Sequence, residues 1–159
     1  MRQAAGNPGR GRKAFSLLEL AMVLFIMGVI VAIAMPRYAN SLASYRATLA
    51  ARRIAADLAL ARQTAWATGA SRVATFTQAS SRYQLVGASS LERTTAPYVV
   101  DLAAGPYCAT LQAVSLGGAT SITFDGYGFP DRGGQIVVQS GSSRKTVVID
   151  PATGNATLQ

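Results

Sequence analysis

One feature limits the fold of this chain more than any other, an apolar run close to its N-terminus. Between Phe15 and Met35 there are 21 residues, of which only Ser16 and Glu19 are polar. At a helical rise of about 1.5 Å per residue the run is about 31 Å long, enough to cross a bilayer core of about 30 Å. A carboxylate is costly in hydrocarbon, so we expect Glu19 to have a functional partner.

Basic residues precede this run. Arg2, Arg10, Arg12 and Lys13 are four of the 15 basic residues in the chain, and without them the net charge of +8 would be +4. Such a flank orients a membrane helix with its N-terminus in the cytoplasm. Since half of the net charge belongs to the flank, the charge by itself gives no reason to expect nucleic-acid binding.

The composition excludes most kinds of catalytic or metal site. The sequence has no histidine, which rules out Ser-His and Cys-His nucleophile pairs and metal sites that use imidazole. Its single cysteine, Cys108, cannot form an intrachain disulfide, and we expect it to be a small buried side chain. Asp125, Asp131 and Asp150 are too dispersed to hold calcium. We therefore expect no enzymatic activity, no metal and no cofactor.

Two ordinary interpretations of the N-terminus explain only part of it. A cleaved secretory signal would have a shorter apolar core followed by an Ala-x-Ala pattern, but this run ends at Met35-Pro36-Arg37. A plain single-pass anchor explains the apolar run and its basic flank. It gives no reason for the carboxylate of Glu19.

The residues at the start of the run favour a third interpretation. Lys13-Ala14 precedes Phe15, Glu19 is the fifth residue counted from Phe15, and Pro36 is the twenty-second. This arrangement resembles the prepilin signal shared by type IV pilins and type II secretion pseudopilins, in which a basic leader and a small residue precede a Phe, and a Glu stands at the fifth mature position. Ala14 stands where that family usually has glycine.

The resemblance implies a mechanism. A prepilin peptidase would cut between Ala14 and Phe15 on the cytoplasmic side and methylate the new amine of Phe15. The apolar segments would then pack together in a filament built on an inner-membrane assembly platform. The Phe15 amine of a neighbouring pilin or pseudopilin would supply the cation that Glu19 needs, and this pair would set the register between subunits.

Helical periodicity continues past Pro36. One apolar stripe consists of Tyr38, Leu42, Tyr45 and Leu49, and a second of Ile54, Leu58, Ala61 and Ala65. We expect one helix from about Phe15 to Thr68, bent near Pro36, whose second half packs against a head. Asp57 is expected to form a solvated salt bridge with a neighbouring arginine. The spacing of Asp57-Leu58, Ala61-Arg62 and Ala65 resembles the "DL..AR..A" pattern of FimT- and GspH-type minor pilins and pseudopilins.

After Gly69 the pattern changes to short alternating runs separated by Gly, Ser and Pro, which predicts strands. The expected strands are Arg72–Thr77, Arg82–Val86, Tyr98–Leu102, Thr110–Ser115, Ser121–Phe124, Gln135–Gln139, Lys145–Ile149 and Ala156–Leu158. They are expected to form one antiparallel sheet or two small ones. The stretch from Ile122 to Pro130 resembles the family's "i.F...G.p" pattern, with its aromatics in the core, and Trp66 and Tyr83 are expected in the same core.

The predicted fold is α+β and pilin-like, with a long N-terminal helix packed against a small antiparallel β-sheet head. Its expected parts are a cleaved leader at 1–14, a transmembrane half of the helix at 15–36, an amphipathic half at 37–68 and a periplasmic β-rich head at 69–159. We expect a single-pass inner-membrane protein with a cytoplasmic N-terminus.

The expected function is that of a minor pilin or pseudopilin, and the sequence leaves open whether it serves type II secretion or a type IV pilus. The alternative is a DNA-binding minor pilin for natural transformation. FimT-like DNA receptors carry arginines after a glycine near the C-terminus, where this chain has Gly154-Asn155-Ala156-Thr157. Arg144 and Lys145 remain as weak candidates, and two cations add little affinity for phosphates. We therefore do not expect nucleic acid as a partner.

Overall fold

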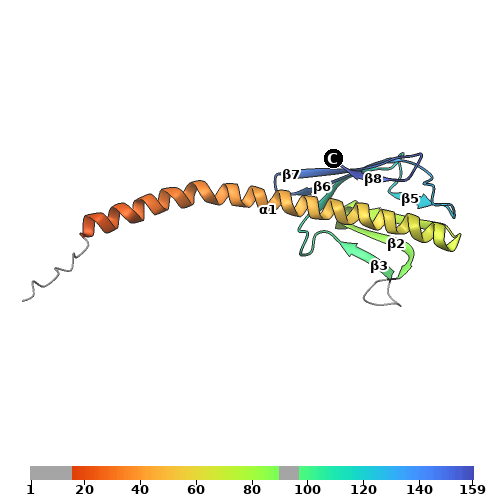
Figure 1. Ribbon diagram of the computed structural model, residues 1–159, viewed down its shortest axis with the longest axis horizontal. Helices are drawn as coiled ribbons and strands as arrows, with labels where there is room; N and C mark the ends of the chain where they lie inside the picture. Colours follow the sequence, from red (N-terminus) through yellow and green to blue (C-terminus); the bar gives the residue numbers. More distant parts are fainter. Residues whose placement is uncertain (1–15, 90–96) are drawn as a thin grey trace, which may run out of the picture. The chain divides into compact units, whose positions relative to one another are not determined.

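The computed structural model of this chain describes residues 16–89 and 97–159. In these residues a single long helix, α1, is followed by short strands (Figure 1). The elements in chain order are α1 (Leu17–Thr68), β1 (Arg72–Thr77), a short 3-10 helix η1 (Gln78–Ser80), β2 (Arg82–Ser89), β3 (Pro97–Asp101), β4 (Thr110–Ser115), β5 (Ser121–Phe124), β6 (Gly134–Ser140), β7 (Ser143–Ile149) and β8 (Ala156–Leu158). The chain divides into two units, residues 1–37 and residues 38–159, which we call the N-terminal unit and the head. From here on the head includes the second half of α1 as well as the strands.

The helical part of the head presents a narrow face of small side chains to the core. Its buried residues recur every three or four positions, as expected for one face of a helix, and are Ala47, Ala50, Ala51, Ile54, Asp57, Leu58, Ala61 and Ala65. Alanine favours helix and adds little bulk. The face of the helix that enters the core is therefore made mostly of small apolar side chains.

The strands of the head form two four-stranded antiparallel sheets. The first has the order β3-β2-β1-β5 and the second the order β4-β6-β7-β8. In Figure 1, β6, β7 and β8 are seen on one side of the helical part of the head and β2 and β3 on the other. Inward-facing side chains of both sheets join the helix in one core, which includes Tyr83, Leu85, Ile122 and Phe124 of the first sheet and Ile136, Val138, Val147 and Ile149 of the second.

The structure confirms the predicted α+β, pilin-like fold. Of the two predicted possibilities, one antiparallel sheet or two small ones, it has two sheets. Each predicted strand is present, four of them with the predicted bounds, and α1 ends at Thr68 as predicted. The short helix η1 joins β1 to β2, and Ser81 follows it in a left-handed conformation at φ 51°. The helix passes through Pro36. A bend at that residue stays a prediction.

Three expectations about aromatic side chains were wrong. Trp66 is 70% exposed, Tyr127 80% and Phe129 57%, although all three were expected in the core. Ala65 and Gly128 occupy the buried positions next to them, where Gly128 lies against the helix. A residue adjacent to a buried one, on a helix or in a tight turn, points to another side. Tyr83 and Phe124 are buried as expected.

Cys108 was also predicted wrongly, because it is exposed and not buried. It lies in the turn between β3 and β4 at φ 45°, a left-handed conformation outside any strand. Its carbonyl oxygen accepts a hydrogen bond of 2.9 Å from the Ser140 hydroxyl. Cys108 is therefore held through its backbone.

Candidate functional site

The N-terminal unit begins its helix with a side-chain cap. The hydroxyl of Ser16 accepts a hydrogen bond of 3.3 Å from the Leu18 amide, and the Ser16 carbonyl accepts one of 3.1 Å from the Leu20 amide. Ser16 and Glu19 have the spacing of a capping box, and Glu19 lies in the first turn, where the helix dipole favours a carboxylate. This local role of Ser16 was not predicted, although the Ser-x-x-Glu spacing signals it.

This unit buries none of its apolar side chains within the described structure. Every residue from Ser16 to Arg37 is exposed, including Phe25 at 73% and Met35 at 71%. The helix is long and apolar enough to cross a membrane. An apolar surface of this extent is stable only in lipid or against other apolar helices.

The predicted site residues of this unit fall in different parts of it. Ala14 and Phe15 lie outside the described residues. Glu19 is near the start of α1, and no salt bridge to it is found within residues 16–89 and 97–159. Pro36 lies inside α1. The expected roles in cleavage, register and bending are therefore still predictions.

In the head, a buried polar network ties the helix to the first sheet. The Asp57 side chain is 8% exposed, and its carboxylate accepts hydrogen bonds from the Tyr83 hydroxyl at 2.5 Å, the Tyr98 hydroxyl at 2.8 Å and the Arg53 Nε at 3.1 Å. Arg53 also donates from Nη2 to the Tyr98 hydroxyl. The expected salt bridge to a neighbouring arginine forms with Arg53. The expectation that it is solvated was wrong, because β2 and β3 bring two tyrosines over Asp57.

The network changes the acidity of its members. Burial raises the pKa of Tyr83 well above its ordinary value, and the Asp57 carboxylate raises it further. Burial and a hydrogen bond to Asp57 also raise the pKa of Tyr98. Both hydroxyls therefore stay protonated and donate to the carboxylate at neutral pH. This arrangement holds the helix and sheet together, and it contains no group suited to nucleophilic chemistry.

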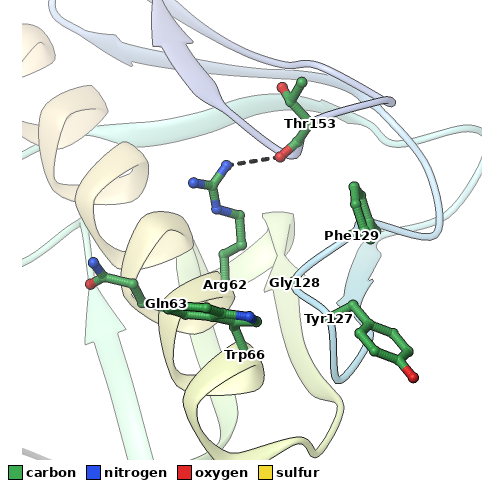
Figure 2. A pocket seen from close by; sticks show the side chains of 7 residues that line it. All are labelled: Arg62, Gln63, Trp66, Tyr127, Gly128, Phe129 and Thr153. Carbon is green, nitrogen blue, oxygen red and sulfur yellow. Dashed lines mark hydrogen bonds between the residues drawn. The ribbon is translucent and has the colours of Figure 1, made fainter.

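A second constellation lies at the surface of the head, near the end of α1. A pocket of about 390 Å³ is lined by Arg62, Gln63, Trp66, Tyr127, Gly128, Phe129 and Thr153. These residues come from α1, from the turn after β5 and from the turn before β8 (Figure 2). Arg62 Nη1 joins two of them, because it donates to the Thr153 carbonyl at 2.8 Å and to the Asn155 Oδ1 at 2.5 Å.

The last part of α1, the strands from β1 to β7 and the pocket fall inside one family match. A family model described as "Type II transport protein GspH" matches residues 50–153, well over half of the chain. This chain belongs to the GspH family. Neither a curated protein nor a solved structure matches it.

Membership of the GspH family confirms the GspH-type resemblance inferred from the pattern between Asp57 and Ala65, and the prepilin signal at the N-terminus stays a prediction. The matched residues include Asp57 and all seven residues that line the pocket. Residues 16–37 lie outside the match. The family assignment therefore rests on the head.

The weak nucleic-acid candidates of this GspH-family chain lie on β7. Arg144 is exposed, and its Nε donates to Gln139 Oε1 at 2.9 Å on the neighbouring strand. Lys145 is partly buried. The two residues are adjacent on one strand, so their side chains point to opposite faces of the sheet. They do not form a joint phosphate site.

Within residues 16–89 and 97–159, no group of three or more His, Cys, Asp or Glu side chains is close enough to hold an ion. The candidate functional features of the chain are therefore its exposed N-terminal helix and the surface of its head.

Proposed function

We propose that this chain is a minor pseudopilin that a prepilin peptidase processes and that assembles into a type II secretion pseudopilus. The single observation that carries the proposal is the joining of two parts in one chain. One is an exposed apolar helix with a carboxylate in its first turn, and the other is a head of the GspH family. The chain would act in protein secretion as a structural component without catalytic activity.

Processing is the first step of the proposed mechanism. The peptidase cuts between Ala14 and Phe15 on the cytoplasmic face of the inner membrane, and the new amine of Phe15 is methylated. Residues 15–36 then hold the chain in the inner membrane, with the head in the periplasm. The basic residues before Ala14 support this orientation.

Assembly is the second step, and Glu19 directs it. The described part of the chain offers its carboxylate no cation, and an unpaired charge in an apolar environment costs several kcal/mol. The Phe15 amine of a neighbouring pseudopilin satisfies the carboxylate only when the two helices have the correct axial register. The inner-membrane assembly platform brings the helices together, and the apolar surfaces of residues 16–37 pack in the filament.

A deletion strain tests the proposed system. Removing this chain should abolish export of a type II secretion substrate, which accumulates in the periplasm, and leave surface pili and natural transformation unchanged. Plasmid-borne wild-type chain should restore export. Loss of pili with normal secretion would assign the chain to a type IV pilus and contradict the proposal.

DNA capture is the second candidate, and its only support is the basic pair Arg144 and Lys145. An electrophoretic mobility shift of double-stranded DNA with the full chain in detergent, at near-physiological salt, tests it. We expect no shift at micromolar protein, because the two side chains point to opposite faces and affinity for phosphates needs many cations. A salt-sensitive shift that Arg144→Ala and Lys145→Ala remove would favour DNA capture.

A further inference from the structure

The pocket at the end of α1 gathers exposed aromatic side chains that the core does not use. From residue 46 onward, the described residues leave three large aromatics exposed, Trp66, Tyr127 and Phe129, and all three line this pocket. Burying exposed aromatic surface of this kind is a main source of affinity at protein interfaces. We call this feature the Trp66 pocket.

The turn that carries two of these aromatics is held in place by the helix. Gly128, at φ 80°, is buried, and a Cβ there would lie 3.3 Å from Arg62 Cγ and 3.6 Å from Trp66 Cβ. The Asp125 carboxylate accepts hydrogen bonds from the amides of Tyr127 at 3.0 Å and Phe129 at 2.8 Å. The backbone that carries Tyr127 and Phe129 is therefore held in one conformation, which lowers the entropic cost of binding.

Arg62 adds a directed positive group to this apolar surface. Its Nη1 is engaged by Thr153 and Asn155, while its Nε and Nη2 have no hydrogen-bond partner among residues 16–89 and 97–159. Figure 2 shows the guanidinium next to the pocket, with its Nη1 directed to Thr153. The Nε and Nη2 edge of a guanidinium matches the two oxygens of a carboxylate.

The charges around the pocket select among anionic ligands. Asp125 anchors the turn after β5, and Asp150 anchors the turn before β8, where its Oδ1 accepts from the Ala152 amide at 2.7 Å. This bond to the Ala152 amide, with a further one to the Thr153 hydroxyl, lowers the pKa of Asp150, so this side chain is ionised at neutral pH. The two carboxylates belong to turns that contribute residues to the pocket, and they disfavour a ligand with several negative charges, such as a chain of phosphates. Arg62 is the charged side chain among the residues that line the pocket.

From these contacts we propose that the Trp66 pocket docks an extended segment of a partner protein, in which one carboxylate stands next to an aromatic or large apolar side chain. The apolar side chain contacts Trp66 and Phe129, and the carboxylate pairs with the free edge of Arg62. A volume of about 390 Å³ is within the range of ligand pockets and suits one side chain and its neighbour. The proposal deepens the proposed function, because it gives the head its own contact with a protein partner, separate from the helix.

Two peptides that differ only in charge test this proposal on the full chain in detergent micelles. They are Ac-Gly-Phe-Glu-Gly-NH2 and Ac-Gly-Phe-Gln-Gly-NH2, which contain no tryptophan, while Trp66 is the only tryptophan of the protein. The Glu peptide should shift Trp66 emission to shorter wavelength, protect it from acrylamide, and saturate. The Gln peptide should bind about fivefold more weakly or worse.

Variants at other residues locate the binding site, so the test does not depend on an Arg62 variant folding correctly. Phe129→Ala should weaken binding of the Glu peptide. The control Val99→Ala removes an exposed apolar side chain of β3 outside the pocket and should leave binding unchanged. Arg62→Lys should remove the preference for Glu over Gln, while Arg52→Lys on the exposed face of α1 should preserve it.

Three results would overturn the proposal. They are equal binding of the two peptides, no response of Trp66 to either, and protection of Trp66 by single-stranded dT15 in place of the peptides. None of them bears on secretion in the deletion strain. A failed docking surface is therefore distinguishable from a failed assignment to type II secretion.

Discussion

Replacing Asp57 by alanine should destabilise the head more than any other single removal of a charge. The carboxylate accepts three hydrogen bonds in the core between α1 and the first sheet. In Asp57→Ala the Tyr83 hydroxyl loses its acceptor while the residue stays 2% exposed. Arg53 keeps the Tyr98 hydroxyl as a partner, so the loss falls mainly on the two tyrosines.

The size of the effect follows from those bonds. A hydrogen bond to a charged group contributes about 1.5–3 kcal/mol, so two tyrosine hydroxyls give about 3–6 kcal/mol. Removing the carboxylate also removes the cost of burying it, which lowers the net loss. We expect the free energy of unfolding to fall by about 3–4 kcal/mol and Tm by about 10 °C or more. Asp57→Asn, which keeps one acceptor, should lose less.

Urea unfolding of the full chain in detergent, followed by circular dichroism of the strands, measures this loss. The matched control is Asp101→Asn, which weakens an exposed bridge to Arg82 and should change stability little. A double-mutant cycle of Asp57→Ala with Tyr83→Phe should show a coupling above about 1 kcal/mol. If Asp57→Ala costs no more than the control, or if the two changes are additive, the network does not hold the helix to the sheet.

Further predictions concern processing, alkaline pH and a close backbone contact. Ala14→Leu should block cleavage and leave an unshifted band on a gel, because the site before the cut takes a small residue. Folding raises the pKa of Tyr83, so above pH 10 unfolding releases its proton, and the free energy of unfolding should fall by up to about 1.4 kcal/mol per pH unit. Urea melts at several pH values measure this slope, and Tyr83→Phe should flatten it. The control Tyr127→Phe, at an exposed site, should leave the slope unchanged. Gly128→Ala should cost about 1–3 kcal/mol in the same melts, and more than Gly118→Ala, because both glycines have positive φ but only the first is in close contact with the helix.

The elements of this fold could be predicted because their signals are local. Alanine and a three-to-four-residue apolar spacing predict the helix up to Gly69, and Gly- and Ser-rich turns separate the strands. The predicted strand bounds are exact for β1, β4, β5 and β8. The choice of two sheets depends on which strands pair, and a single sequence does not contain that information in its periodicity.

The errors concern contacts between residues far apart in the chain. The burial of Asp57 depends on Tyr83 and Tyr98, which are 26 and 41 positions away. The exposure of Trp66 and Phe129 depends on Gly128 taking the buried place against the helix. The roles of Ala14, Phe15 and Glu19 need an enzyme or a second subunit, so the fold of one chain does not decide them.

The central claim is that the N-terminal helix is an assembly element in which Glu19 needs a cation from a neighbour. Incorporation of Glu19→Ala into filaments sheared from cells tests it most directly, with the amount of processed chain in the inner membrane as the internal control. We predict that the variant enters the membrane and is processed as well as wild type, while its amount in filaments falls to background. Normal incorporation of Glu19→Ala would contradict the account, because the carboxylate would then have no part in assembly.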